Sequence, residues 1–255
     1  MQNAALAALG LADQWSYEAI DVEPEKFARR VRGLPDDGFV GANVTIPHKR
    51  AALDVADRAS AAASEIGAAN TLSFKDRLIQ AENTDATGLL SALPEAPTGR
   101  DVLVLGAGGS ARAAVWALEG RAASVSVWNR TAGRADELVR DLGGPTAGGR
   151  IAAIDRVQAR TLAFDLIVNC TAVGMGDEDP FEHLPLDPES LSSGVIVVDL
   201  VYAGGESRLV GEACKRGAKT VDGLEVLVRQ GGESLRIWTG LDPPLDVMRQ
   251  AARNP

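Results

Sequence analysis

The chain has 255 residues, of which 45% are hydrophobic and 24% charged, so it can bury a sizeable core and is not intrinsically disordered. Acidic residues outnumber basic ones by 35 to 26, and a net charge of −9 without a basic cluster argues against nucleic-acid binding. Two cysteines and two histidines are too few for a zinc cluster or a disulfide scaffold. The sequence contains no run of about 18 apolar residues, the length that would indicate a membrane span. We expect a cytoplasmic monomer or homodimer with no bound metal and reduced thiols.

Residues 1–90 are predicted to form a small α/β unit. The expected strands are 17–22, 39–46, 70–74 and 78–81, and the expected helices are 24–32 and 49–64. A segment with two prolines and a glycine, 91–100, then separates this unit from a differently patterned one.

Residues 91–222 alternate apolar strands with helices. Strands are expected at 102–105, 123–128, 164–170 and 195–202, and helices at 111–118 and 134–142. Strands that are apolar throughout indicate a parallel sheet covered on both faces, which makes the fold class α/β. Residues 223–255 are predicted to be helical, with an apolar face along 224–238. We expect them to pack back on the first unit, because the second already has a complete sheet.

The strand at 102–105 runs into a glycine-rich turn that is typical of dinucleotide binding. The turn reads Gly106-Ala107-Gly108-Gly109-Ser110-Ala111. In this pattern the first glycine permits a tight turn, the second lets the backbone approach a pyrophosphate, and the small third residue brings the helix close to the strand. The pyrophosphate then lies at the helix N-terminus, where free N–H groups attract it.

The end of the second strand favours NADP over NAD. An NAD protein carries an acidic residue about 20 residues after the glycines, to hold the ribose 2′-hydroxyl. Here that place reads Trp128-Asn129-Arg130-Thr131, and the first acid is Asp136. Arg130 and Arg134 could grip a 2′-phosphate with forked hydrogen bonds. The alternative is that both are solvated surface arginines.

Two groups of the first unit are candidates for acid–base chemistry. Lys49 follows Pro47, which suits a first helical turn, so the lysine should lie near a helix N-terminus. The helix dipole disfavours a cation there, which suits a lysine that transfers a proton, although a surface lysine would tolerate the small cost. Asp85 follows a strand, where a carboxylate is more often a cap for the next helix. Asn70 and Thr71 are equally ambiguous.

At this point the sequence resembles the shikimate dehydrogenase family along nearly its whole length. The matching strings of the first half are Gly41-Ala42-Asn43-Val44-Thr45-Ile46-Pro47-His48-Lys49, Gly67-Ala68-Ala69-Asn70-Thr71-Leu72 and Asn83-Thr84-Asp85 with Gly88. Those of the second half are Gly106–Ala111, Asn129-Arg130-Thr131, Asn169-Cys170-Thr171 with Gly174-Met175, and Asp199-Leu200-Val201-Tyr202. Those of the tail are Gly223, Gln230-Gly231 and Trp238-Thr239-Gly240.

The resemblance implies a small substrate domain, 1–90, a Rossmann domain for NADP, 91–222, and C-terminal helices, 223–255, that return to the first domain. Lys49 matches the family's catalytic lysine, and Asp85 matches its partner, which binds a substrate hydroxyl and orients the lysine. The other implied substrate-binding residues are Thr45, Asn70, Tyr202 and Gln230. The implied NADP-binding residues are Gly106, Ala107, Gly108, Gly109, Ser110, Asn129, Arg130, Thr131 and Arg134, with Leu200 and Gly223 near the nicotinamide.

The implied reaction is the reversible reduction of 3-dehydroshikimate to shikimate by NADPH, a step toward chorismate and the aromatic amino acids. Two alternatives remain open. One is an enzyme of this architecture that acts on quinate or an aminated relative, although Arg130 argues against an NAD-linked quinate dehydrogenase. The other is a non-catalytic NADP-binding paralogue, against which the intact Lys49 and Asp85 argue.

The sequence departs from the family at its start. The family has a strand and a Ser-x-Ser-Pro turn, whose serines hold the substrate carboxylate, before its first helix; this sequence begins with Met1-Gln2-Asn3. That strand lies between the strands that match 17–22 and 39–46, so both are expected to have unpaired backbone groups. The expected result is normal NADP binding, poor shikimate binding and faster amide exchange in the first unit. Two smaller departures, the segment after Tyr202 and Gly232, look tolerable.

Overall fold

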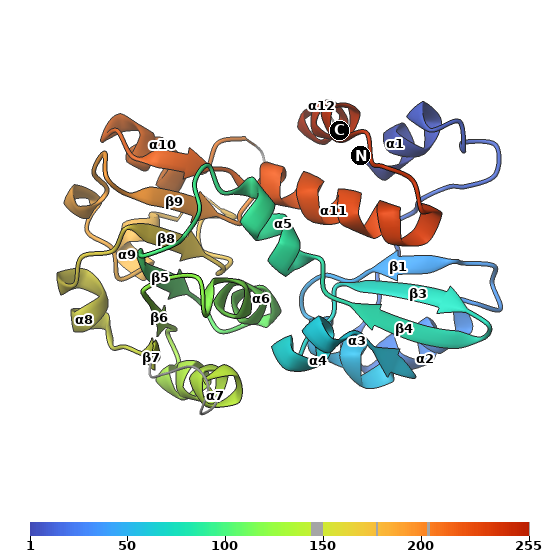
Figure 1. Cartoon of the computed structure of the whole chain (residues 1–255), viewed down its shortest axis with the longest axis horizontal. Helices are drawn as coiled ribbons and strands as arrows, with labels where there is room; N and C mark the ends of the chain where they lie inside the picture. Colours follow the sequence, from blue (N-terminus) through green and yellow to red (C-terminus); the bar gives the residue numbers. More distant parts are fainter. Residues whose placement is uncertain (144–149, 177, 203–204, 255) are drawn as a thin grey trace. The chain divides into compact units, whose positions relative to one another are not determined.

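The computed structural model describes residues 1–143, 150–176, 178–202 and 205–254. The chain forms two compact units: unit 1 comprises Met1–Gly88 and Leu227–Pro255, and unit 2 comprises Leu89–Val226. Both boundaries fall within helices, α5 (Asp85–Ala92) and α11 (Gly223–Thr239). The α/β fold class is confirmed (Figure 1).

Unit 1 contains a four-stranded sheet in the order β1-β3-β4-β2 within the part of the chain described. The strands are β1 (Gly41–Asn43), β2 (Arg58–Ala59), β3 (Thr71–Lys75) and β4 (Leu78–Glu82). β3 and β4 form an antiparallel hairpin whose two turn residues, Asp76 and Arg77, have φ values of 53° and 62°. Two positive φ angles are what a tight hairpin turn requires. β1 extends the sheet antiparallel to β3, and β2 lies parallel to β4.

Two groups of helices give unit 1 two small cores. The short 3₁₀ helix η1 (Pro24–Lys26) leads into α2 (Phe27–Gly33), and α3 (Lys49–Val55) and α4 (Ala61–Ile66) follow later. α2, α3 and α4 pack with the sheet around Phe27, Ala52 and Leu72. The other core lies between α1 (Gln2–Ala8), α11 and α12 (Leu245–Arg253), around Leu6 and Leu235. The C-terminal segment from Leu227 onward thus belongs to unit 1, as Figure 1 shows for α11 and α12.

The predicted strand 17–22 is wrong, because this segment has no regular structure. Its backbone is held by a side chain instead: Asn3 Oδ1 accepts from the Tyr17 N–H at 2.7 Å, and Asn3 Nδ2 donates to the Tyr17 carbonyl at 2.9 Å. β1 is also shorter than expected and lies at an edge of the described sheet. A cavity of about 150 Å³ lies between segment 16–22 and β1. The expected weak binding of shikimate stays a prediction.

The predicted helix 49–64 is interrupted. α3 ends at Val55, and Asp57 then binds the neighbouring strand: its N–H donates to the Ile79 carbonyl, and its Oδ2 accepts from the Ile79 N–H at 2.8 Å. Ser60 starts α4 by accepting from the Ala63 N–H at 3.2 Å. Strand pairing and a helix cap therefore override the helical pattern. Pro47 also lies before the N-cap His48, rather than inside the first turn.

The described residues of unit 2 form a six-stranded parallel sheet. The strands are β5 (Asp101–Leu105), β6 (Ser124–Trp128), β7 (Ile151–Ala153), β8 (Leu166–Asn169), β9 (Ile196–Asp199) and β10 (Lys219–Val221). Their order, β10-β9-β8-β5-β6-β7, is the doubly wound order of dinucleotide-binding domains. Such sheets bind ligands outside the carboxyl ends of the strands, where the winding direction reverses between the first and fourth strands, here β5 and β8.

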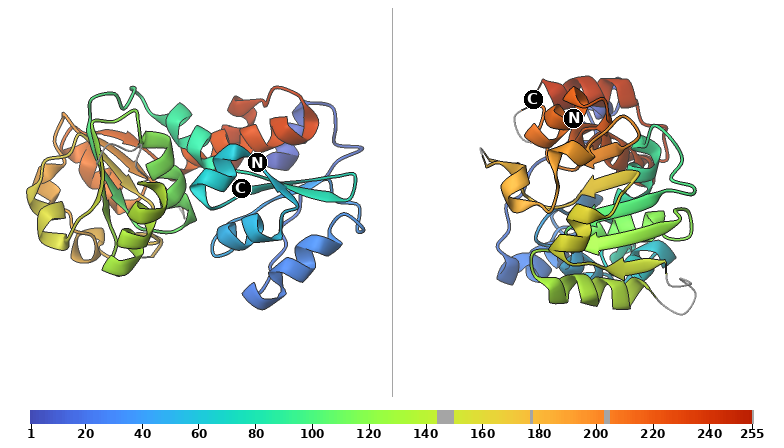
Figure 2. Two further views of the ribbon diagram at one scale, coloured as in Figure 1. Left: turned by 60° about the horizontal axis from the view of Figure 1, so that its bottom comes forward. Right: turned by 90° about the vertical axis from the view of Figure 1, so that its left-hand side faces the viewer.

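Helices cover both faces of this sheet (Figure 2). Val102 and Val104 of β5 point to the face covered by α6 (Gly109–Leu118) and α7 (Ala132–Leu142). Leu103 and Leu105 point to the opposite face. Three helices contribute to that second core: α8 (Arg156–Thr161), α9 (Pro180–His183) and α10 (Arg208–Lys215), with the 3₁₀ helix η3 (Pro188–Ser190) beside them in sequence. The central strands β5, β8 and β9 are buried along nearly their whole length for this reason. The short edge strands β7 and β10, which were not predicted from the sequence, are partly exposed.

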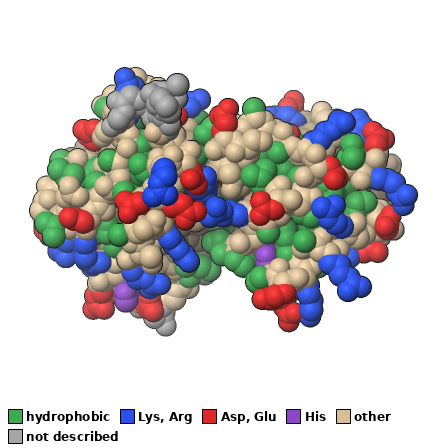
Figure 3. Space-filling view, turned by 90° about the horizontal axis from the view of Figure 1, so that it is seen from below, with side chains coloured by type: hydrophobic (Ala, Val, Ile, Leu, Met, Phe, Trp, Pro, Cys, Tyr) green, Lys and Arg blue, Asp and Glu red, His purple; other side chains and the backbone are tan. Residues whose placement is uncertain are grey.

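The surface carries charges of both signs. On the face shown in Figure 3, acidic and basic side chains are interspersed and form no broad basic patch. No helix among the described residues is long and apolar enough to cross a membrane.

Candidate functional site

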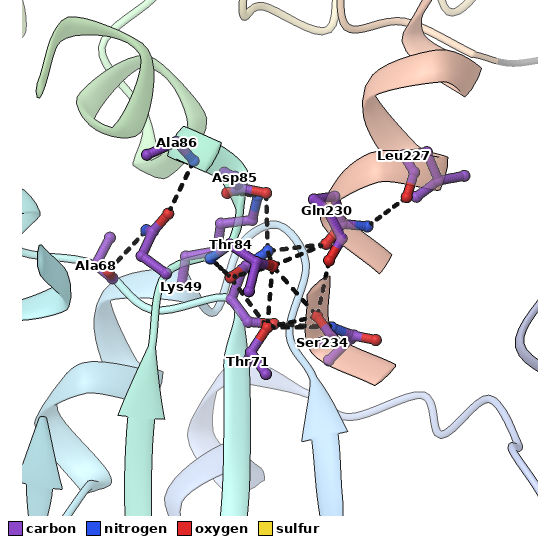
Figure 4. A network of polar contacts seen from close by, with 12 residues as sticks. Lys49, Ala68, Thr71, Thr84, Asp85, Ala86, Leu227, Gln230 and Ser234 are labelled. Carbon is purple, nitrogen blue, oxygen red and sulfur yellow. Dashed lines mark hydrogen bonds and ion pairs between the residues drawn. The ribbon is translucent and has the colours of Figure 1, made fainter. Parts of the chain in front are cut away.

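Lys49 and Asp85 form a close ion pair in unit 1 (Figure 4). Lys49 is the first residue of α3, and Asp85 is the first residue of α5. The Lys49 Nζ atom donates to Asp85 Oδ2 at 2.6 Å, and the two side chains are 12% and 15% exposed. A helix N-terminus disfavours the lysine charge but favours the carboxylate, so the aspartate compensates the unfavourable position of the lysine. The pair is partly shielded from water yet reachable from outside.

Asp85 does not cap its helix. Asn83 does so instead: its Oδ1 accepts from the Ala86 N–H at 3.4 Å, while its Nδ2 donates to the Ala68 carbonyl at 2.9 Å. Both carboxylate oxygens of Asp85 are then available for other side chains, one for Lys49 and one for Asn70. The expectation that this carboxylate more often caps a helix is therefore not met.

Asn70 is the centre of the polar network around this pair. It lies just before β3, is only 2% exposed, and its Oδ1 accepts from the Thr84 N–H at 2.7 Å. Its Nδ2 lies 2.9 Å from each of three oxygens: Thr84 Oγ1, Asp85 Oδ1 and Gln230 Oε1. A carboxamide nitrogen has two hydrogens, so it can serve two of the three at a time. The Thr84 hydroxyl can itself donate, to Asn70 Oδ1 at 3.2 Å or to Gln230 Oε1 at 3.4 Å, so the network also has an internal donor.

Gln230 comes to this network from α11. A Cβ atom built on Gly88 would lie 2.7 Å from Gln230 Cβ, so only glycine at position 88 permits this approach of α5 and α11. The Trp238 Nε1 atom, two turns further on, donates to the Leu72 carbonyl at 2.9 Å and fixes α11 to β3. Gly88 and Trp238 thus fix the position of the Gln230 side-chain amide.

Four network residues are absent from the predicted site: Asn43, Thr71, Thr84 and Ser234. Ser234 Oγ is buried and lies 2.8 Å from both Asn43 Nδ2 and Thr71 Oγ1. Its position four residues after Gln230 on one helix places both on the same face, which is a signal the sequence offered. Of the other three, Thr71 was considered with Asn70 and left ambiguous, whereas Asn43 and Thr84 were named only as parts of the motif strings.

The remaining predicted substrate-binding residues lie outside the hydrogen bonds described above. Thr45 is exposed on the loop between β1 and α3, where it lines the cavity beside β1. Tyr202 belongs to unit 2 and is 48% exposed. The roles of both in substrate binding stay predictions.

The glycine turn of unit 2 has the geometry expected of a phosphate loop. Gly106 has a φ of 109°, which favours glycine, and a Cβ there would lie in tight contact with the Cys170 carbonyl oxygen, at 3.2 Å. Gly108 is the N-cap of α6, and a Cβ there would meet nothing within 4 Å, which leaves the backbone open to a ligand. Ala111 is fully buried against the sheet. The residues fit a pyrophosphate at this helix N-terminus.

Arg130 and Arg134 lie just beyond β6, at the same carboxyl edge of the sheet. Both are exposed, and neither guanidinium forms an ion pair with an acid in the described parts of the chain. The nearby turn is fixed by Asn129, whose Nδ2 donates to the Thr131 carbonyl at 2.8 Å, and Thr131 is the N-cap of α7. Two unneutralised guanidiniums at a fixed turn fit a 2′-phosphate.

Leu200 and Gly223 lie against one another in unit 2. A Cβ on Gly223 would lie 2.7 Å from the carbonyl oxygens of both Leu200 and Val201, so the start of α11 packs directly on the backbone that follows β9. The two residues predicted to lie near the nicotinamide are thus brought together at the carboxyl edge of the sheet.

Asp199, the last residue of β9, is a buried carboxylate with 0% exposure. Burial raises the pKa of Asp199 above its ordinary value of 3.8, although hydrogen bonds from Ser207, the Val201 N–H and Asn169 act in the opposite direction.

This raised pKa predicts a pH dependence of stability. Because the native state holds the proton more tightly than the unfolded chain, the contribution of protonated Asp199 is complete below the ordinary carboxyl value of 3.8 and is lost as pH rises through the raised pKa. The free energy of unfolding of the wild type should therefore fall relative to that of Asp199→Asn across this window. Urea unfolding of both proteins at a series of pH values measures the difference, and a difference that does not change with pH would contradict the assignment.

Comparison with known proteins matches three family descriptions to successive parts of the chain. Residues 1–72 match the shikimate dehydrogenase substrate binding domain, and residues 91–175 match shikimate / quinate 5-dehydrogenase. Residues 223–253 match the shikimate 5'-dehydrogenase C-terminal domain. The matches follow the chain in the order of the motifs and include Lys49, Asn70, the glycine turn and Gln230.

Individual relatives resemble the chain over nearly its full length. A shikimate dehydrogenase (NADP(+)) from Geobacter metallireducens is 43% identical over 98% of this chain and 89% of its own. The structure of shikimate 5-dehydrogenase from Thermus thermophilus in complex with NADP(H) and shikimate has a TM-score of 0.85 at 38% identity, covering 99% of this chain and 92% of its own. A 5-ketofructose reductase from a Gluconobacter strain has a TM-score of 0.83 at 30% identity, over 98% and 91% of the two chains. The chain therefore belongs to the shikimate dehydrogenase family.

Proposed function

We propose that this protein catalyses the reversible, NADP-dependent reduction of 3-dehydroshikimate to shikimate, a step in the synthesis of chorismate and the aromatic amino acids. The observation that carries the proposal is the ion pair between Lys49 and Asp85, held by Asn70 in a partly buried polar network. We assign substrate binding to unit 1 and cofactor binding to unit 2.

Lys49 is the proton donor and acceptor in this proposal. NADPH, when bound, supplies the hydride that reduces the ring ketone. The Lys49 ammonium gives a proton to the oxygen as it gains negative charge, and Asp85 keeps the lysine aimed at that oxygen. In the oxidation of shikimate the same nitrogen must accept the hydroxyl proton, so it has to be neutral. Reduction therefore uses the charged lysine, and oxidation uses the neutral one.

The acceptor oxygens of the network suit a substrate rich in hydroxyl groups. Asp85 and Gln230 each present a side-chain oxygen beside Asn70, and Gln230 is only partly buried. Because such an oxygen accepts more than one hydrogen bond, a substrate hydroxyl can donate to Gln230 or Asp85 in addition to their present partners. A ligand without hydroxyl groups forgoes these hydrogen bonds and is disfavoured.

The cofactor assignment rests on unit 2. The open backbone at Gly108, the helix N-terminus of α6 and the two unneutralised guanidiniums of Arg130 and Arg134 favour NADP(H) as the dinucleotide. Neither Cys170 nor Cys214 forms a disulfide in the described structure, and reduced thiols suit a cytoplasmic location.

A different polyol or ketone is the second candidate substrate. The structural resemblance to a 5-ketofructose reductase favours this alternative, since it shows that the same fold occurs in an enzyme of another name. The test measures NADP reduction with shikimate and with quinate in parallel, over concentrations of each substrate up to saturation. Reduction with shikimate at a higher kcat/KM than with quinate supports the proposal. NADPH binding without turnover of either substrate contradicts it.

The variant Asp85→Asn tests the second half of the pair. Asparagine keeps the shape but loses the charge that holds the Lys49 ammonium, so kcat should fall and KM for shikimate should rise together, each by about tenfold or more. Steady-state kinetics of NADP reduction measures both, and thermal unfolding checks the fold. If the unfolding temperature fell while both kinetic constants stayed the same, Asp85 would have only a structural role.

A further inference from the structure

Asp199 is a buried charged group that the proposed chemistry does not use. It lies at the carboxyl end of β9, directly opposite Asn169 of β8 in the parallel register. No lysine or arginine of the described segments forms an ion pair with it, and burial raises its pKa. Burying a carboxylate without a paired cation costs free energy of folding, so the hydrogen bonds that stabilise Asp199 indicate what it does.

Three donors from three segments converge on this carboxylate. Asn169 Nδ2 donates to Oδ1 at 2.8 Å, and the Val201 N–H donates to the same oxygen at 3.2 Å. Ser207 Oγ donates to Oδ2 at 2.6 Å. Ser207 is also the N-cap of α10, where its Oγ accepts from the Val210 N–H at 3.2 Å. The carboxylate thus ties the end of β8, the backbone after β9 and the start of α10 to one point.

Asn169 carries the constraint into the loop after β8. Its Oδ1 accepts from the Thr171 N–H at 3.1 Å and from Thr171 Oγ1 at 2.7 Å, and its Nδ2 also reaches the Val173 carbonyl at 3.3 Å. The orientation of this amide is fixed by Asp199, because Nδ2 must point at the carboxylate. The turn from Asn169 to Val173 therefore depends on Asp199 for its shape.

Both loops held in this way border the place where a dinucleotide crosses the sheet. The Cys170 carbonyl lies against Gly106 of the phosphate turn, and the carbonyls of Leu200 and Val201 lie against Gly223. In a doubly wound sheet the two halves of a dinucleotide lie on either side of the switch point. Arg130, beyond β6, marks the half that takes the adenosine 2′-phosphate. The half formed by β8, β9 and β10 is then left for the nicotinamide.

We propose that Asp199 is a positioning residue that shapes the binding surface for the nicotinamide half of the cofactor by fixing residues 169–173 after β8 and the backbone of Leu200 and Val201 after β9. The inference rests on the proposed use of NADP(H). The role of Asp199 is geometric, because its carboxylate accepts hydrogen bonds from three donors at once. Asparagine could keep the arrangement: its Oδ1 would accept from Asn169 and Val201, and its Nδ2 would donate to Ser207 Oγ.

The test compares the whole cofactor with a fragment that lacks nicotinamide. Asp199→Ala should bind adenosine 2′,5′-bisphosphate as tightly as the wild type but should bind NADPH more weakly. Its kcat for shikimate oxidation should fall about 10- to 100-fold, because a small displacement of a reacting group slows hydride transfer to this extent. In Asp199→Asn, kcat should stay within about fivefold, because a neutral hydrogen bond replaces a charged one.

A matched control is Asp165→Ala. Asp165 Oδ2 also accepts a backbone hydrogen bond in unit 2, from the Asp101 N–H at 2.9 Å, but at the amino ends of the strands. The variant Asp165→Ala should leave the affinity for NADPH and kcat unchanged. If Asp199→Ala does not fold, Ser207→Ala can replace it, because it removes one of the three donors to the carboxylate. This variant should weaken the binding of NADPH but not that of the bisphosphate.

The proposal is overturned if the bisphosphate and NADPH lose affinity by equal factors, if neither NADPH affinity nor kcat changes, or if Asp199→Asn is as impaired as Asp199→Ala. The ligand-binding measurements do not need turnover. If the wild type binds NADPH but oxidises neither shikimate nor quinate, the proposed function fails, while the ratio of NADPH to bisphosphate affinity still decides the role of Asp199.

Discussion

Replacing Lys49 by alanine should lower kcat for shikimate oxidation by about 10²- to 10⁴-fold, the usual contribution of a general acid or base. The expected cause is the loss of the only amine in contact with Asp85 among the described residues. NADPH affinity should stay nearly unchanged, because the predicted cofactor-binding residues belong to unit 2 whereas Lys49 belongs to unit 1. Steady-state kinetics and fluorescence titration with NADPH measure the two quantities.

Lys75→Ala is the control for this variant. Lys75 is an exposed lysine at the end of β3 in the same unit, so its replacement makes the same change in charge and composition away from the network. It should leave kcat unchanged. If Lys49→Ala kept more than a tenth of the wild-type kcat, the lysine would not be the proton-transfer group.

Replacing Arg130 by alanine should weaken NADP binding about 10- to 100-fold and leave the weaker binding of NAD almost as it was. A hydrogen bond to a charged group contributes roughly 1.5–3 kcal/mol, and only NADP carries the 2′-phosphate that Arg130 would hold. The matched control is Arg140→Ala, because Arg140 is an exposed arginine near the other end of α7. Titration of each variant with both nucleotides measures the selectivity. Equal losses for NADP and NAD would show that Arg130 supports the fold instead.

The sequence predicted unit 2 better than unit 1, for a physical reason. In unit 2 the central strands β5, β8 and β9 are buried along nearly their whole length, so local composition indicates these strands directly. The short edge strands β7 and β10 are partly exposed and were not predicted. The glycine turn also carries its own geometric requirement, since only glycine tolerates the φ of 109° at Gly106.

In unit 1 the structure is decided by contacts between distant residues. Segment 17–22 looks like a strand, but the Asn3 side chain takes the backbone hydrogen bonds of Tyr17. The break after α3 depends on Asp57 reaching Ile79, 22 residues away. No local pattern reports such partners, so propensity alone gave a strand and a continuous helix.

The candidate site was predicted unevenly for the same reason. Lys49, Asp85, Asn70 and Gln230 lie together, which supports their grouping from the motifs. Spacing alone could not distinguish Asp85 from a helix cap, because the choice depends on Asn83 making the cap. Ser234 was missed although it follows Gln230 by about one helical turn, because the prediction from motifs did not use this spacing.

The rate of NADPH formation in a single turnover, measured at saturating shikimate and NADP for the wild type and Lys49→Ala, tests the central claim most directly, because it excludes product release. The account predicts that the variant binds both ligands but forms NADPH about 10²- to 10⁴-fold more slowly than the wild type. A variant that forms NADPH at the wild-type rate would contradict it.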